Sequence, residues 1–197
     1  MSFLNIDRFR IILASNSPRR KKFLEKINIP FEIITHEIEE IYPSNFIESE
    51  ISDHIAMIKA APFKGKLKKN ELVITADTIV WIENKCLGKP KTKNESKEML
   101  KKISNKDHKV ITSVCLTSID KQIIFNEKSL VSFRKLKTNE INYYVDNFYT
   151  LDKAGAYGIQ DWIGIIGIKK IIGSYTNIVG LPVSQLIENI KAFIKYQ

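Results

Sequence analysis

The spacing of hydrophobic residues predicts a strand, a helix and a second strand at the start of the chain. Residues 10–14 and 31–34 form short apolar runs that are typical of buried strands. Between them, Ser17 is a suitable helix N-cap, and Pro18 suits the first helical position because the N–H that proline lacks would be unpaired there anyway. The apolar face of this helix comprises Phe23, Leu24 and Ile27. We therefore expect a strand–helix–strand unit.

Helix-like and strand-like patterns continue to alternate along the rest of the chain. The further elements predicted in this way are a helix from a cap at Ser44 to Pro62, with Ile47, Ile51, Ile55 and Ile58 on one face, a strand at 72–76 that leads through Asp77-Thr78 to 79–82, a hairpin turn at 83–85, a helix capped by Thr92 and Glu95, a meander of strands at 110–117, 122–125 and 130–133, a helix capped by Thr138, a strand pair at 156–160 and 165–172, and a final helix opened by Leu181-Pro182. This order predicts an α/β fold with a mixed central sheet flanked by helices. A length of 197 residues fits one domain, or two small lobes that share a core.

Composition narrows the class of protein. Apolar residues make up 44% of the chain and charged residues 27%, as in ordinary soluble proteins. No apolar run approaches the roughly 20 residues that a membrane span needs, and the first ten residues lack the pattern of a secretory signal. Cys86 and Cys115 have apolar neighbours and no metal-ligand spacing, so we expect plain buried thiols. We therefore expect a cytoplasmic protein with no membrane partner.

The net charge of +9 is compatible with a partner that carries phosphates. Only five of the 31 basic residues are arginines, and the joint excess of Lys, Ile and Asn is typical of an AT-rich genome. A nucleic-acid-binding protein usually concentrates its charge and interleaves aromatic residues, whereas these lysines are scattered from Lys21 to Lys195. We therefore expect no stable nucleic-acid partner.

Two of the five arginines open the first predicted helix, in the run Ser15-Asn-Ser-Pro-Arg-Arg20. Backbone N–H groups and the helix dipole favour an anion at such a point, and Arg19 and Arg20 add guanidinium groups that match phosphate oxygens. The alternative is a solvated first turn with a capping serine, because basic residues there oppose the dipole. The residues favour a phosphate site and leave the alternative open.

Asp77 follows an apolar strand, and ligands of α/β sheets collect at the ends of strands. Its carboxylate can bind a divalent cation, take a proton from water, or close a turn. Lys89 is held on a stiff loop by Gly88 and Pro90, where it either faces a phosphate or belongs to an ordinary turn. Both segments are candidates for a site that handles phosphates.

Two weaker candidates are Glu39-Glu40 and the segment 152–160. The glutamates supply a metal ligand or form a solvated acidic turn. The second segment is rich in small residues and ends in Gln160, so it lets a backbone approach a ligand or forms a bulged strand. His36, His54 and His108 show no metal spacing and are expected to be structural or exposed, and the absence of GxxxxGK[ST] excludes a Walker-type NTPase.

Together, these segments resemble the Maf family of nucleotide pyrophosphatases. The matching pieces occur in the family's order over residues 11–187, and the set is far more specific than any one piece. They are Leu13-Ala-Ser-Asn-Ser-Pro-Arg-Arg20, Glu39-Glu40, Ile55-Ala-Met-Ile-Lys-Ala60, Ala76-Asp-Thr78, Gly88-Lys-Pro90, Asp152-Lys-Ala-Gly-Ala-Tyr-Gly-Ile-Gln160 and Gly173-Ser-Tyr-Thr-Asn-Ile-Val-Gly-Leu-Pro182. One departure is Asp161-Trp162, where family members tend to carry a glycine after the glutamine.

The resemblance implies a single domain over 1–197 with a Maf and ITPase type of fold, in which two lobes flank a cleft. It implies hydrolysis of a nucleoside triphosphate to the monophosphate and pyrophosphate, with Mg²⁺ or Mn²⁺ as cofactor. The motif variants look like those of the branch that acts on dTTP and UTP, not the sister branch that acts on 7-methyl-GTP. This likeness assigns substrate selection to Arg19, Thr78 and Gln160. The expected partner is the nucleotide, and a homodimer is an option for assembly.

On this resemblance, Asp77 is the expected catalytic proton acceptor and, with Glu40, the expected metal ligand. The expected phosphate-binding residues are Ser15, Arg19, Arg20, Lys59 and Lys89. Only the resemblance selects Lys59, because the helical pattern beside Ile58 alone predicts a solvated lysine. Two alternatives stay open: the same reaction on another base, and a non-enzymatic regulator that binds nucleic acid or a division partner.

Overall fold

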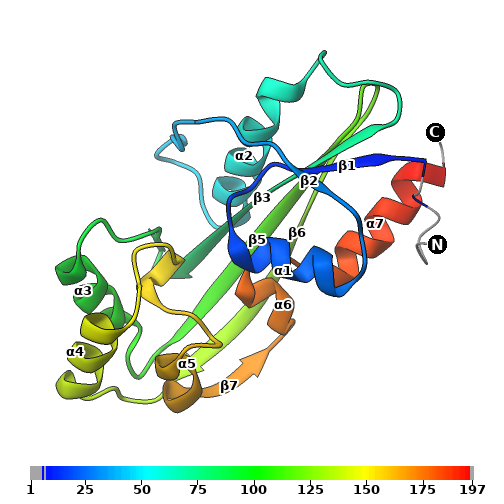
Figure 1. Cartoon of the computed structure of the whole chain (residues 1–197). Helices are drawn as coiled ribbons and strands as arrows, with labels where there is room; N and C mark the ends of the chain where they lie inside the picture. Colours follow the sequence, from blue (N-terminus) through cyan, green and yellow to red (C-terminus); the bar gives the residue numbers. More distant parts are fainter. Residues whose placement is uncertain (1–5, 7, 196–197) are drawn as a thin grey trace. The chain divides into compact units, whose positions relative to one another are not determined.

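The structure is a computed structural model that describes residue 6 and residues 8–195. The chain divides into two compact units. Unit 1 takes the chain up to Asp77, Thr112–Glu127 and the chain from Gly180 on, and unit 2 takes Thr78–Ile111 and Lys128–Val179. Three long strands contribute to both units, namely β3 (Glu71–Ile82), β5 (Asp107–Thr117) and β6 (Gln122–Phe133) (Figure 1).

The strands form a mixed sheet in the order β2-β1-β3-β5-β6-β7, with β4 paired to β3. Its shorter strands are β1 (Arg10–Leu13), β2 (Glu32–Ile33), β4 (Lys85–Leu87) and β7 (Ile168–Ile172). β1 runs parallel to β2 and to β3, whereas the β3–β4 and β6–β7 pairs are antiparallel. The predicted mixed α/β sheet is therefore confirmed.

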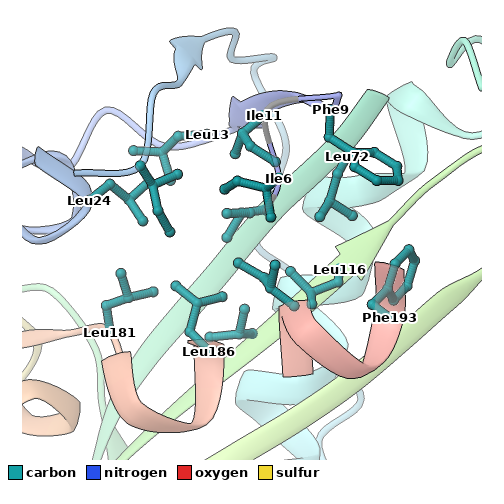
Figure 2. Close-up of a cluster of buried hydrophobic side chains, with 14 of the residues drawn as sticks. Ile6, Phe9, Ile11, Leu13, Leu24, Leu72, Leu116, Leu181, Leu186 and Phe193 are labelled. Carbon is teal, nitrogen blue, oxygen red and sulfur yellow. The ribbon is translucent and has the colours of Figure 1, made fainter. Parts of the chain in front are cut away.

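Successive side chains of a strand point to opposite faces of the sheet. In unit 1, helices cover both of these faces of β1, β3 and β5. On one face, α1 (Pro18–Lys26) and α7 (Val183–Lys195) bury a core with the strands. Figure 2 shows Leu24 of α1 and Leu186 of α7 in the same cluster as Leu72 of β3. The other face of the strands lies against α2 (Ser49–Ala60), which η1 (Ala61–Phe63) follows. The face that α2 covers carries the functional residues described below.

Unit 2 has its own core around the buried rings of Phe133, Tyr144 and Tyr157. Its helices are α3 (Lys93–Ile103), α4 (Thr138–Asn147), the short η2 (Ala154–Ala156), α5 (Trp162–Gly167) and α6 (Tyr175–Val179). Helices α3 and α4 pack against each other. The expected turn between β3 and β4 is present, with Glu83 and Asn84 at positive φ. Across the described residues of both units, none of the helices has the length and apolarity needed to cross a bilayer.

The predicted start of the second helix at Ser44 is wrong, because α2 begins at Ser49. The Phe46 N–H donates to the Pro43 carbonyl in a turn, and Glu48 has a φ of 47°, which no α-helix tolerates. Ile47 continues the spacing of the isoleucines and is nevertheless 58% exposed. Hydrophobic periodicity therefore extended this helix beyond its true beginning.

The predicted strand pair at 156–160 and 165–172 is also wrong. The first segment is not a strand, and the strand within the second pairs with a different segment. Gly155 and Ala156 both have positive φ, which ends any extended run there. Residues Trp162–Gly167 form α5, and only Ile168–Ile172 form a strand, which pairs with β6. A Cβ on Gly164 would lie 2.4 Å from the Ile159 carbonyl oxygen, so this glycine allows the helix to pack on the preceding turn.

Candidate active site

Small and hydroxyl-bearing residues seat α2 closely on the strands of unit 1. The Thr75 hydroxyl of β3 donates a 2.7 Å hydrogen bond to the Ala56 carbonyl of α2. Ala56 and Ala60 form a fully buried cluster with Cys115 of β5. Because these alanines have no bulk, the C-terminal end of α2 lies close to β3. The position of the next side chain on that helix face follows from this contact.

That side chain is Lys59, whose ammonium lies 2.8 Å from Asp77 Oδ1. Asp77 is two residues after Thr75 and therefore points from β3 to the same face. Its side chain is only 9% exposed, and that of Lys59 is 17% exposed. A carboxylate removed from water is costly unless it is paired, so the ammonium is its natural counter-ion. The strand continues to Ile82, which makes the expected position of Asp77 at a strand end wrong: it is a mid-strand residue.

Glu40 reaches the same ammonium from the irregular segment between β2 and α2. Its Oε1 lies 2.8 Å from Lys59 Nζ, and its side chain is 41% exposed. The lysine is therefore held between a buried carboxylate and a half-exposed one. Glu40, Lys59 and Asp77, which the resemblance selected from three distant segments, form one cluster within unit 1, and the pattern-based expectation of a solvated Lys59 is wrong.

The first turn of α1 adds a second part to the unit 1 site. Ser17 caps the helix as predicted, and its hydroxyl accepts from the Arg20 N–H at 3.5 Å. Arg20 also donates from Nη1 to the Ser15 hydroxyl at 3.1 Å and from Nε to the Gly180 carbonyl at 2.9 Å. Gly180 has a φ of 119°, a conformation that favours glycine. Arg20 thus orients Ser15 and ties the start of α1 to the segment before α7.

The charges of these two parts act on each other. Burial lowers the pKa of the Arg20 guanidinium, whereas the nearby Asp77 carboxylate opposes this shift. The neighbouring Arg19 lowers the pKa further, and Glu40 raises it. Arg20 remains protonated because arginine titrates far above neutral pH. The unit 1 cluster, defined as Ser15, Arg20, Glu40, Lys59 and Asp77, therefore joins fixed cations to two carboxylates, with Arg19 beside it.

Unit 2 carries the other predicted site residues. Thr78 follows Asp77 in β3 and is partly exposed, whereas Lys89 and Gln160 are exposed. The loop of Lys89 is bound to the segment that leads to Gln160, since the Gly155 N–H donates to the Gly88 carbonyl at 3.1 Å. A Cβ on Gly155 would lie 2.9 Å from a Val80 methyl, so glycine lets this segment approach β3. Unit 2 therefore connects the strand of Thr78 with the segments of Lys89 and Gln160.

The carboxylates of the unit 1 cluster fit a divalent cation that takes its other ligands from phosphate oxygens and water. Asp77 and Glu40 already converge on one cation, the Lys59 ammonium. Residues 6 and 8–195 contain no group of three or more His, Cys, Asp or Glu side chains that could hold a metal alone. Mg²⁺ commonly binds through one or two carboxylates, with phosphate oxygens and waters as its other ligands. The donor set matches this second kind of site.

Two features of the site are harder to find from the sequence. The line Ile51, Ile55, Lys59 has a constant spacing of four, which puts the lysine on the buried face of α2. That spacing is a usable signal for Lys59. The Gly180 carbonyl that accepts from Arg20 is a backbone group 160 residues away, and no pattern of side chains predicts this contact.

Comparisons with known proteins show what this chain is similar to. The family model described as "Maf-like protein" matches residues 10–193. The chain is 50% identical over 177 residues to a protein of Flavobacterium psychrophilum named "dTTP/UTP pyrophosphatase", with 90% of this chain and 91% of that one covered. It is 47% identical to a protein of Christiangramia forsetii with the same name, with 93% of this chain and 94% of that one covered.

Solved structures with low sequence identity share the fold. A Staphylococcus aureus Ham1 protein superposes with a TM-score of 0.54 at 16% identity, and 94% of this chain and 98% of that chain are covered. A HAM1 protein from Coxiella burnetii gives a TM-score of 0.51 at 15% identity, with 96% of this chain and 100% of that chain covered. The family model spans nearly the whole chain, and the curated relatives align over nine tenths of it. On these grounds the chain is a member of the Maf-like family.

Proposed function

We propose that this protein hydrolyses dTTP and UTP to the nucleoside monophosphate and pyrophosphate. The observation that carries the proposal is the buried Asp77 carboxylate, held at 2.8 Å by the Lys59 ammonium next to a helix start that carries Arg19 and Arg20. Relatives that are 43–50% identical over most of the chain bear the name of this activity. An acidic side chain among fixed cations suits the hydrolysis of a phosphoanhydride.

In the proposed reaction, Asp77 accepts a proton from the water that attacks the α-phosphorus. A bond forms between the water oxygen and phosphorus, and the bond from phosphorus to the α,β-bridging oxygen breaks, so that pyrophosphate leaves. Asp77 suits this task because β3 and the Lys59 contact fix its carboxyl group. Proton transfer to a positioned group typically contributes about 10²- to 10⁴-fold in rate.

The cations of the chain stabilise the charge that develops on phosphate oxygens. In unit 1 this role belongs to Arg19, Arg20 and Lys59, with the Ser15 hydroxyl as a neutral donor beside them, and in unit 2 it belongs to Lys89. Asp77 and Glu40 would hold the Mg²⁺ or Mn²⁺, which supplies further neutralisation of the phosphates when bound. Such preorganised charges are the main source of rate in phosphoryl transfer, since the protein does little covalent chemistry there.

Selection of the base is assigned to Arg19, Thr78 and Gln160. A glutamine amide offers both a donor and an acceptor to a base edge. We also propose that the enzyme is cytoplasmic. No disulfide joins its cysteines, of which Cys115 is buried and Cys86 partly buried, and such thiols are usual in a reducing compartment.

The test is a panel of common and modified nucleoside triphosphates, scored for released pyrophosphate with Mg²⁺, with Mn²⁺ and with EDTA. We expect turnover of dTTP and UTP that depends on the metal. Asp77→Asn should lower kcat about a hundredfold or more, because the amide cannot accept the proton. Asp120→Asn, at an exposed position between β5 and β6, is the matched control and should retain full activity.

Two results contradict the proposal. One is near-normal pyrophosphate release by a folded Asp77→Asn enzyme, which removes Asp77 from the reaction. The other is steeply salt-dependent binding to DNA or RNA without turnover of any nucleotide, which favours a regulatory protein.

A further inference from the structure

A single buried hydroxyl holds both ends of the turn that contains Gln160. Tyr144 of α4 is fully buried, and its ring stacks on Phe148 with centroids 5.1 Å apart. Its hydroxyl donates to Asp161 Oδ2 at 2.8 Å and accepts from the Gly158 N–H at 3.3 Å. The turn is closed by the Asp161 N–H, which donates to the Gly158 carbonyl at 3.0 Å. Gln160 therefore lies between two residues that are fixed by the same phenol.

The Asp161 carboxylate has a second partner that keeps it in place. Lys153 Nζ lies 3.5 Å from Asp161 Oδ2 and 2.8 Å from Asp152 Oδ1, and the lysine side chain is only 11% exposed. Burial and the Asp161 carboxylate both raise the pKa of Tyr144. The phenol therefore stays protonated and acts as a donor to Asp161. The residue that departs from the family pattern is thus part of a closed hydrogen-bonded network within unit 2.

Gly158 brings the Gln160 amide and the Asp161 carboxylate together. A Cβ on this glycine would lie 2.7 Å from Asp161 Oδ2 and 2.8 Å from Gln160 Nε2. Both polar groups therefore rest on the space where a side chain would otherwise be. Gln160 is exposed, so packing around its own side chain does not hold it. The turn beneath it sets the place from which its side chain starts.

We propose that Tyr144 and Asp161 are positioning residues that fix the Gln160 amide and thereby set the selection of the nucleobase. The inference rests on the proposed function, which assigns base selection to Gln160. A glutamine amide reads a base edge through one donor side and one acceptor side, so a shift of the turn that carries it changes which atoms of the base it can reach. Sites that read hydrogen bonds discriminate strongly, because a wrong partner leaves polar groups unpaired. The nucleotides whose selection this turn would affect are the dTTP and UTP of the proposed function.

The first test is Tyr144→Phe, which keeps the buried ring and removes only the hydroxyl. We expect the ratio of kcat/KM for dTTP to that for dATP to fall about tenfold, through KM for dTTP, while kcat stays within about twofold. Tyr143→Phe is the matched control: it removes the same hydroxyl one residue earlier, from a side chain that is 50% exposed and keeps its ring contact with Trp162. This control should retain wild-type selectivity.

Gly158→Ala is a second variant that does not remove the buried hydroxyl. Its backbone lies outside the left-handed region, so alanine adds no backbone strain there, and its methyl displaces the Gln160 and Asp161 side chains. The same loss of selectivity is expected. Introducing Tyr144→Phe into a Gln160→Ala background separates positioning from general damage, because an effect that passes through Gln160 disappears there.

The inference is overturned if folded Tyr144→Phe and Gly158→Ala enzymes keep wild-type selectivity, or if Tyr144→Phe lowers it equally without Gln160. A wild-type enzyme that releases no pyrophosphate from dTTP or UTP contradicts the proposed function instead. In that case ¹⁵N relaxation of the Gln160 side-chain amide decides the inference. The amide should be ordered in the wild-type protein and mobile in Tyr144→Phe, and equal mobility in the two proteins overturns it.

Discussion

The ammonium group of Lys59 lies between two carboxylates, and the consequences of its removal differ for the two. Glu40 is half-exposed and can recover water, whereas the Asp77 side chain is 9% exposed and would lose the cation that contacts it directly. Breaking a buried ion pair on one side costs about 3–5 kcal/mol, far more than the net gain from forming it. Lys59 is therefore a stability determinant as well as a proposed phosphate ligand.

We expect Lys59→Met to lower the free energy of unfolding by about 3 kcal/mol. Adding Asp77→Asn to this variant should restore most of the loss, because the stranded carboxylate is then neutral. Urea unfolding of the single and double variants measures both effects. Lys21→Met, at an exposed position of α1, is the control. Equal stability of Lys59→Met and wild type would contradict the burial of this ion pair.

At the scale of the element, the seat of α2 on the sheet depends on residues without bulk. Ala56 is fully buried, and its carbonyl accepts from the Thr75 hydroxyl. Lys59 lies one turn further on the same face. A larger side chain at Ala56 would push the helix from β3 and carry the lysine with it.

Ala56→Leu should therefore destabilise the fold by about 1–3 kcal/mol through overpacking, and it should also lower kcat. Met57→Leu is the matched control on the same helix, because Met57 is 44% exposed. Chemical unfolding and pyrophosphate release, measured on the same preparations, link the two effects. A stable and fully active Ala56→Leu enzyme would show that α2 is not closely seated.

The elements differ in how far their sequences predict them. Ser17 and Pro18 mark the start of α1 correctly, because capping is a local interaction between neighbouring residues. The start of α2 was wrong because Ile47 continues the apolar spacing although it is exposed. Helix α5 was missed because its glycines resemble those of a bulged strand. In the structure Gly164 lies against the Ile159 carbonyl and Gly167 against the Phe133 ring, and the sequence does not show these contacts.

In the candidate site too, residues with a local signal can be predicted from the sequence, whereas contacts made by the tertiary structure cannot. Asp77 is detectable as an acidic residue in an apolar strand, and the arginine pair as an exception in a lysine-rich chain. The pairing of Lys59 with Asp77 depends on how α2 docks on β3, which hydrophobic spacing does not specify. Lys59 was selected only by its resemblance to a family motif. Tyr144 carried no signal, because on α4 it looks like an ordinary core residue.

At the scale of the whole molecule, His108 makes stability depend on pH. It is 2% exposed, its Nε2 pairs with the Tyr157 hydroxyl at 2.7 Å, and its Nδ1 has no hydrogen-bond partner among the described residues. Burial lowers its pKa from 6.5 to about 4. Between these values the unfolded chain binds more protons than the folded one, so stability is complete above about pH 6.5 and falls as the pH drops towards 4.

The full loss expected from this group is about 3 kcal/mol, from a shift of between two and three pKa units. Thermal unfolding at pH 7, 6, 5 and 4.5 should show a wild-type Tm that falls more steeply than that of His108→Phe. His36→Gln, at an exposed position, should follow the wild-type curve. Parallel curves for wild type and His108→Phe would contradict the burial of a neutral imidazole.

The lysine held by Glu40 and Asp77 has one more consequence, which concerns how the enzyme is made and stored. Since the protein supplies its own counter-ion for these acids, folding does not need to wait for an imported cation. On the proposed metal-dependent reaction, chelation should stop pyrophosphate release without unfolding the protein. On the same proposal, the metal can arrive with each nucleotide and leave with the products, so the folded protein does not have to retain it between turnovers.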